Sequence, residues 1–239
     1  MKKCVLKFVF AVLVLSPFCA KATNMAFTGS GTITDGDIYA DVGVQNSGTV
    51  VNMSGGQITN ILGVFSGGTF NMSGGLISGY SVDVGSSGTF NITTGTIDAF
   101  DFVVEGSASF YGGNITAYRL KTYPASSIAT ASVVNINGGN INFDMFDIHG
   151  VVNIYRGLLY VNDAWIGGWG NDQPVVNIYG SNFNYNTQTK ILTGYLLDSN
   201  PFTIKGVDAS EYARFNLIPE PMSILFFGFG LLALRKSKK

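Results

Sequence analysis

The chain has little charge, few helix-forming residues and almost no residues that commonly ligate metals. Asp, Glu, Lys and Arg make up 12% of its 239 residues, and His149 is the single histidine. Both cysteines, Cys4 and Cys19, lie near the N-terminus, so the rest of the chain holds no thiol and no disulfide. A metal site needs several converging ligands. We therefore expect no metal, no cofactor and an exposed turn position for His149.

The near-zero net charge hides an uneven distribution, because basic residues are concentrated at the two ends. Residues 23–217 contain six basic and fourteen acidic side chains, which gives this part a net charge of −8. Such a charge argues against nucleic acid as a partner. The 31 glycines, together with sparse Lys, Glu and Ala, indicate an all-β protein.

One stretch, GTFNMSGGLI at Gly68–Ile77, recurs in imperfect copies along most of the chain. When the copies are aligned, one polar position stays in register at steps of 20, 19, 20, 18, 26, 18 and 24 residues. A period near twenty predicts stacked coils. The residues at this polar position are Thr32, Asn52, Asn71, Asn91, Ser109, Asn135, Asn153 and Asn177.

Within one copy, short runs of alternating apolar residues predict three strands separated by glycine-rich corners. In residues 68–85 the inward positions fall at Phe70, Met72, Ile77, Val82 and Val84. This pattern predicts a parallel β-helix of about eight short three-strand coils over residues 23–183. We expect the aligned asparagines to point outward; an inward asparagine ladder is the alternative. The first coil should place four residues inward: Ile33, Ile38, Val42 and Val44.

The repeat is interrupted twice and then lost. Residues 116–130 and 167–174 break the period, and we interpret both as excursions from the stack. Residues 184–217 no longer follow the repeat, and within them 190–198 and 201–206 suggest a hairpin. A solenoid needs its last apolar rung covered, so this segment is expected to be the C-terminal cap.

Residues 1–22 are typical of a secretory signal peptide. Lys2, Lys3 and Lys7 precede an apolar run over residues 8–15, and Ala20-Lys21-Ala22 supplies small residues for cleavage. The sequence therefore predicts export, with both cysteines removed from the mature protein.

The C-terminal 22 residues, 218–239, carry a triplet, a hydrophobic run and a basic end in that order. The triplet is Pro219-Glu220-Pro221, and the run covers residues 222–234. Thirteen residues make a helix of roughly 20 Å, which is short for a full span. The basic end is formed by Arg235, Lys236, Lys238 and Lys239.

This layout resembles the PEP-CTERM sorting domain, with Met222-Ser223 replacing the frequent Ser-Thr after the triplet. The resemblance implies processing near the triplet by an exosortase-type membrane enzyme. It also implies transient anchoring in the inner membrane by the C-terminal helix, followed by delivery to the cell surface or extracellular matrix. The repeat body is similar to autotransporter-like β-helices.

Acidic residues offer candidate chemistry in two groups, Asp98, Asp101 and Glu105, and Asp144, Asp147 and Asp163. Parallel β-helices include lyases and glycosidases that use paired carboxylates, and Arg119 and Lys121 would be the nearby cations. We interpret the acids as solvated strand faces and turns, and we expect no catalytic residue. A single GGxGxD match at residues 167–172 lacks the tandem copies that calcium binding requires.

Aromatic residues enrich the last third of the repeat and are candidate sugar contacts: Trp165, Trp169, Tyr155 and Tyr160. The alternative is that they close the end of the core. The sequence thus favours a structural or adhesive protein of the cell surface or extracellular matrix, with an extracellular polysaccharide as a candidate partner. A carbohydrate-binding or carbohydrate-active β-helix is the alternative function.

Overall fold

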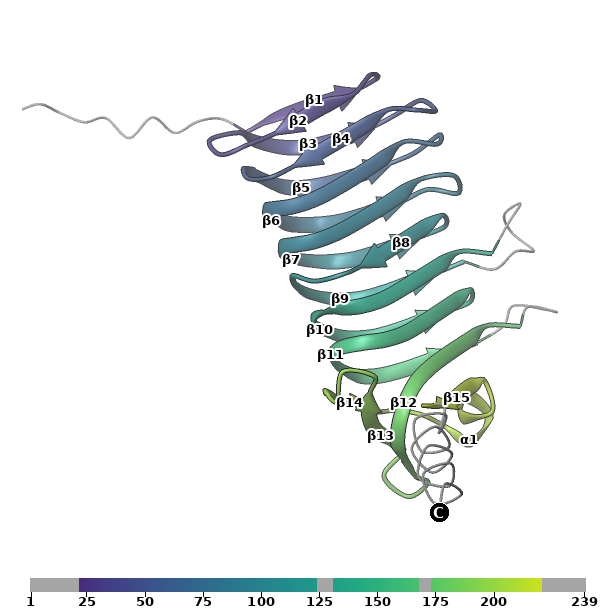
Figure 1. The fold of residues 1–239 in the computed structure, drawn as a ribbon. Helices are drawn as coiled ribbons and strands as arrows, with labels where there is room; N and C mark the ends of the chain where they lie inside the picture. The colour runs from purple at the N-terminus through teal and green to yellow at the C-terminus, as the bar shows by residue number, and fades with distance from the viewer. Residues whose placement is uncertain (1–21, 124–130, 168–172, 221–239) are drawn as a thin grey trace, which may run out of the picture.

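The computed structural model describes residues 22–123, 131–167 and 173–220 (Figure 1). These residues form a β-solenoid of about seven turns, which confirms the predicted fold class. Successive windings stack from β1 to β12, and a smaller set of strands with one short helix lies at the C-terminal end (Figure 1). The predicted signal peptide, apart from residue 22, and the sorting tail after Glu220 lie outside the described residues.

The windings pair in parallel, and equivalent residues of the repeat lie beside one another. Between β6 and β7, Phe70 pairs with Phe90, Asn71 with Asn91, and Ile77 with Ile97. The N-terminal windings are built from β1 (Thr23–Phe27), β2 (Gly31–Ile33), β3 (Ile38–Val44), β4 (Val50–Met53), β5 (Gln57–Val64), β6 (Thr69–Val84) and β7 (Thr89–Val104). The following windings are built from β8 (Ser107–Phe110), β9 (Asn114–Thr122), β10 (Val133–Ile148), β11 (Val151–Ile166) and β12 (Val175–Asn186).

The core is a continuous column of the inward residues of each winding. Phe70 and Phe90 stack with ring centroids 5.8 Å apart, and Phe90 meets the edge of Phe102 at 5.4 Å. All three are fully buried. A winding cannot bury its apolar side chains by itself, so each one depends on the next for this contact.

The first winding departs from the expected inward set at one position. Ile33, Val42 and Val44 are buried as predicted, but Ile38 is 37% exposed, so its prediction was wrong. The register explains the error, because Ile38 pairs with Gln57 on the outer surface while Tyr39 pairs with the buried Ile58. In a short strand, successive side chains point to opposite faces of the sheet. Which of the two sets faces the core depends on the register with the neighbouring strand. Residues 23–27 also form a strand, β1, which pairs with β3.

A column of glycines with positive φ turns the chain at the corner after the first strand of each winding from β2 to β11. Gly75 has φ +85°, and a Cβ there would lie 2.6 Å from the carbonyl oxygen of Gly55 in the preceding winding. Both the positive φ and the close approach of backbone favour glycine.

The first predicted excursion was placed too early. β9 continues to Thr122 and stays in parallel register with β7 and β10, so residues 116–122 belong to the stack. Residues 124–130, the second half of the first predicted excursion, and residues 168–172, within the second, lie outside the described residues.

The C-terminal end changes from parallel to antiparallel pairing. β12 pairs antiparallel with β13 (Ile191–Leu196), which pairs antiparallel with β14 (Pro201–Ile204) as the predicted hairpin. β14 returns beside β11, and after the short helix α1 (Ala209–Tyr212) the strand β15 (Phe215–Pro219) runs parallel to β12. Leu192, Leu196, Phe202 and Ile204 are buried against the last rung of the core.

Candidate functional site

The aligned asparagines form hydrogen-bonded ladders on the outside of the solenoid, as predicted. In the first amide ladder, Asn91 Nδ2 donates to Asn71 Oδ1 and Asn71 Nδ2 donates to Asn52 Oδ1, both at 2.9 Å. A second amide ladder runs in the same direction through Asn216, Asn177, Asn153 and Asn135, with distances of 2.8–2.9 Å. Ser109 occupies the same register position between the two ladders.

An open groove runs beside the first amide ladder. Its lining includes side chains of adjacent windings: Asn52, Asn71, Asn91, Ser73, Thr93 and Tyr111. Tyr111 is 55% exposed, and its backbone N–H donates to the carbonyl oxygen of Ile92 at 2.8 Å. The groove therefore joins a row of amides to an exposed aromatic ring.

Three exposed aromatic residues stack along the solenoid axis; we call them the aromatic ladder. The rings of Tyr80 and Phe100 are 5.8 Å apart at 13°, and those of Phe100 and Tyr118 are 4.9 Å apart at 11°. Their exposed fractions are 59%, 48% and 47% for Tyr80, Phe100 and Tyr118. The ladder forms because each ring follows a small residue that is in register with its counterparts, Gly79, Ala99 and Ala117.

Charged residues converge on the next stretch of the same windings. Arg119 donates to both oxygens of Asp101, from Nε at 3.0 Å and from Nη2 at 2.9 Å. Asp147 Oδ2 lies 4.0 Å from Arg119 Nη1 and 3.9 Å from Lys121 Nζ. The other oxygen of Asp147 is 2.9 Å from His149 Nε2. We call Asp101, Arg119, Lys121, Asp147 and His149 the charged cluster.

Burial in the charged cluster corrects three sequence interpretations. Asp101, Asp147 and His149 are 7%, 4% and 4% exposed, so Asp101 and Asp147 are not solvated and His149 is not an exposed turn residue. Register is the reason, since Asp147 lies between Lys121 and Trp165 of the neighbouring windings. The Trp165 ring also meets the His149 ring edge-on at 5.2 Å.

In the charged cluster, Asp101 and Asp147 are paired with the side chains of Arg119 and Lys121. The hydrogen bonds to Asp101 raise the pKa of Arg119, because they favour its charged form. A carboxylate that already accepts two hydrogen bonds from a guanidinium is poorly placed to act as a base or nucleophile. Within the described part of the chain, no group of three acidic, histidine or cysteine residues could hold a metal ion.

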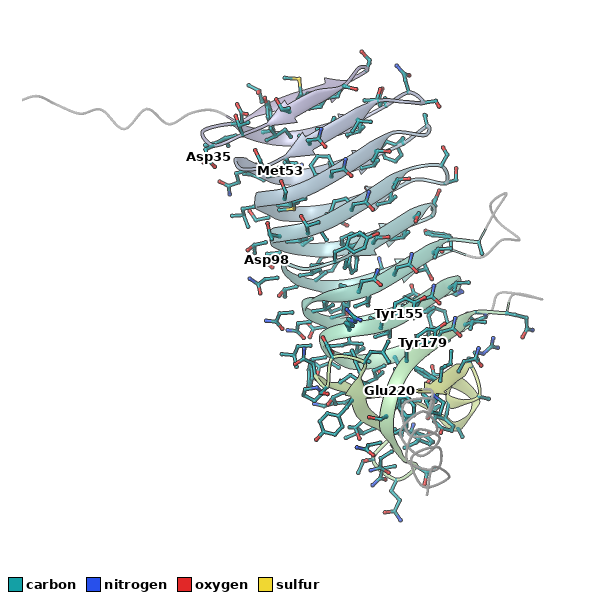
Figure 2. The ribbon with its side chains drawn as sticks, viewed as in Figure 1. Asp35, Met53, Asp98, Tyr155, Tyr179 and Glu220 are labelled. Carbon is teal, nitrogen blue, oxygen red and sulfur yellow. The ribbon has the colours of Figure 1, made fainter. Side chains whose placement is uncertain are left out.

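The three predicted sugar contacts that the structure describes lie in separate stretches of β11. Tyr155 stacks on Tyr179 at 4.4 Å near the C-terminal end of the stack (Figure 2). Tyr160 donates to Asn162 and accepts from Lys205, whose ammonium lies over the Tyr160 ring. Trp165, which is 45% exposed, sits in a later stretch of the same strand, and Trp169 lies outside the described residues.

The predicted sorting motif begins where the solenoid ends. Pro219 is the last residue of β15 and pairs with Gly180. The backbone N–H of Glu220 donates to the carbonyl oxygen of Gly180 at 3.0 Å, and Glu220 lies at the C-terminal end of the molecule (Figure 2). Pro221 and the basic residues Arg235, Lys236, Lys238 and Lys239 lie outside the described residues.

The sequence interpretation missed the aromatic ladder and Tyr111, although the repeat carries a signal for the ladder. Tyr80, Phe100 and Tyr118 are spaced by 20 and 18 residues, the same steps that separate Asn71, Asn91 and Ser109. Residues at these steps lie side by side in a stack, so aligning the outward positions as well as the inward ones would have found the ladder.

Comparisons with protein-family models, with curated proteins and with solved structures give no match to this chain. Within residues 22–123, 131–167 and 173–220, no helix has the length and apolar character needed to cross a membrane.

Proposed function

We propose that the chain is an exported structural and adhesive protein, which attaches to extracellular polysaccharide at the cell surface and catalyses no reaction. The aromatic ladder is the observation that carries this proposal. Exposed apolar patches of contiguous residues on a protein surface mark interaction sites. Here three stacked aromatic rings form one continuous exposed row across adjacent windings.

Hydrogen-bonded polar residues on both sides of the ladder suit it to a sugar polymer. On one side Asn60 Nδ2 donates to Asp41 Oδ1 at 2.7 Å, and on the other Asn162 Nδ2 donates to Asp144 Oδ1 at 2.9 Å. Sugar rings combine apolar C–H faces with hydroxyl groups, so a binding surface needs aromatic and polar groups together. The aromatic ladder would supply the aromatic groups, and the flanking Asp–Asn pairs would supply the polar groups.

A polysaccharide lyase or glycosidase is the second candidate, and the convergence of Asp101 and Asp147 on Arg119 favours it. Catalysis of that kind needs one carboxyl group that donates a proton and one that attacks or activates water. Both carboxylates are buried and paired with the side chains of Arg119 and Lys121 instead. The charged cluster therefore supports an internal role in holding windings together better than it supports catalysis.

Delivery would use the two ends of the chain. Residues 1–22 would direct export, and residues 218–239 would anchor the protein transiently in the inner membrane until an exosortase-type enzyme acts at Pro219-Glu220-Pro221. β15 ends at Pro219, so a cut after the triplet would leave the last strand of the solenoid paired. This arrangement is compatible with processing of a fully folded protein.

The proposal is tested by replacing the aromatic ladder with serine in the full chain: Tyr80→Ser, Phe100→Ser and Tyr118→Ser. The fraction retained on intact cells, compared with that in the medium, is measured in an exosortase-containing bacterium. We expect most of the retained protein to move to the medium. Tyr195→Ser, at a ring that is 46% exposed elsewhere on the surface, is the matched control and should remain on the cells. Unchanged retention of a folded triple variant would overturn the adhesive role.

A further inference from the structure

The groove beside the first amide ladder has hydrogen-bonding capacity that the ladder does not use. Asn71 Nδ2 donates one hydrogen to Asn52, and Asn71 Oδ1 accepts one from Asn91. A side-chain amide has two donor hydrogens and an oxygen that accepts two hydrogen bonds. Asn71 therefore keeps one N–H and one acceptor site beyond the ladder bonds, and it is only half-buried in the groove.

The ladder fixes these amides in position and spacing. Parallel windings place them about 4.8 Å apart, a distance comparable to the length of one sugar unit in an extended polymer. All described bonds of the ladder run in the same direction, from Asn91 to Asn71 to Asn52. A ligand in the groove thus meets a regular row of donor and acceptor pairs that need no reorganisation to bind, which lowers the entropic cost of binding.

The groove lining is uncharged. Among the described residues, the side chains that line it belong to Asn, Ser, Thr, Met and Tyr. An anionic polymer would find no cation there to compensate for its loss of hydration. Sugar hydroxyls, which both donate and accept hydrogen bonds, match the neutral amide of Asn52 and the hydroxyl oxygens of Ser73 and Thr93. The hydrogens of these two hydroxyls are donated to the carbonyl oxygens of Met53 and Met72, so their oxygens serve as acceptors.

Tyr111 adds an aromatic surface at one end of the row. Its ring is 55% exposed and its backbone is held by the hydrogen bond to Ile92. An exposed, positioned tyrosine supplies apolar contact area at low conformational cost.

From these observations we infer that the groove formed by Asn52, Asn71, Asn91, Ser73, Thr93 and Tyr111 is a binding site for a neutral polysaccharide. The polymer lies along the solenoid axis, one amide faces each sugar unit, and Tyr111 packs against an apolar sugar face. The inference goes beyond the adhesive function proposed above, since it adds a second site with a stated ligand class, and it rests on that function only for the extracellular setting.

The test is binding of the purified full chain to microcrystalline cellulose, chitin and starch, with a polygalacturonate gel as the acidic polymer. We expect binding to at least one neutral polymer, and a fall of at least about tenfold in affinity for Asn71→Ala, Asn91→Ala and Tyr111→Ala combined. The host must be one that does not glycosylate, because Asn52, Asn71 and Asn91 each begin an Asn-x-Ser/Thr triplet. Thermal unfolding of each variant checks that it is folded.

The matched control is Asn153→Ala, Asn177→Ala and Tyr195→Ala, which removes the same side chains from the second ladder and another surface. It should bind as the unaltered chain does. No binding to the three neutral polymers, tighter binding to polygalacturonate, or equal losses in the two variants would overturn the inference. The two proposals can be distinguished. If the aromatic-ladder variant is lost from cells while the groove still binds polysaccharide, the adhesive function of the ladder is supported independently of the groove.

Discussion

Arg119 on β9 clamps Asp101 on β7 through two parallel hydrogen bonds, from Nε at 3.0 Å and from Nη2 at 2.9 Å. The two residues are register partners in adjacent windings, so the bond joins one winding to the next. Arg119 also lies 4.0 Å from Asp147 in the following winding. One side chain therefore connects three successive windings.

We predict that Arg119→Met destabilises the protein by about 1–3 kcal/mol, because Asp101 is left buried without its cation. The free energy of unfolding from denaturant titration measures this loss. Arg156→Met is the control, since Arg156 is exposed on the same solenoid and should cost less than about 0.5 kcal/mol. The double variant Asp101→Leu, Arg119→Met should be more stable than Arg119→Met alone. Equal effects at positions 119 and 156 would contradict the role of the clamp.

Two phenylalanines of β7 should lose very different amounts of stability on the same substitution. Phe90 is fully buried and contacts Phe70 and Phe102, so Phe90→Ala should cost about 3–5 kcal/mol. Phe100 is 48% exposed in the aromatic ladder, and Phe100→Ala should cost about 1 kcal/mol or less. Thermal or denaturant unfolding distinguishes them. Similar losses at both positions would mean that the inward and outward assignment of β7 is wrong.

The corner glycines give a third prediction. Gly75→Ala should destabilise the protein by about 1–3 kcal/mol, because the residue needs a positive φ and the new Cβ meets the carbonyl oxygen of Gly55. Gly29→Ala is the matched control, because a Cβ there meets no heavy atom within 4 Å. Denaturation midpoints of the two variants provide the comparison, and a neutral Gly75→Ala would exclude the tight corner.

Alkaline unfolding should depend on Tyr155. Burial raises the pKa of Tyr155 above its ordinary value of 10.0, and its hydrogen bond with Tyr179 adds to this. The unfolded chain then releases this proton at a lower pH than the folded chain. The contribution of Tyr155 to the free energy of unfolding is therefore fully present below about pH 10 and is lost as the pH rises further. In Tyr155→Phe the fall in the free energy of unfolding above that pH should be smaller. An unchanged slope would contradict this contribution.

The repeat period and the alternation of apolar residues were enough to predict the solenoid, its inward phenylalanines and the outward asparagines. Single windings were less predictable. Whether Ile38 or Tyr39 points inward, and whether residues 116–122 stay in the stack, depends on pairing with other windings, which a local pattern does not contain.

The candidate site was harder to predict for the same physical reason. Asp147 and His149 become buried because Lys121 and Trp165 of neighbouring windings lie beside Asp147, at sequence distances of 26 and 18 residues. Taken from the sequence alone, the alternating pattern around Asp147 and His149 predicts that both side chains lie on an exposed strand face. Tyr80, Phe100 and Tyr118 were overlooked because no single repeat shows that they stack. Only their spacing of one repeat each indicates it.

The proposed delivery to the cell surface is tested most directly by fractionating cells that express the full chain or a chain lacking residues 222–239, which leaves β15 intact. The account predicts that the full chain is found on the surface, and that the shortened chain is absent from the membrane and surface fractions and is recovered instead from the periplasm or medium. If both forms occur in the same fractions and in equal amounts, the tail does not sort the protein, and the proposed surface function is contradicted.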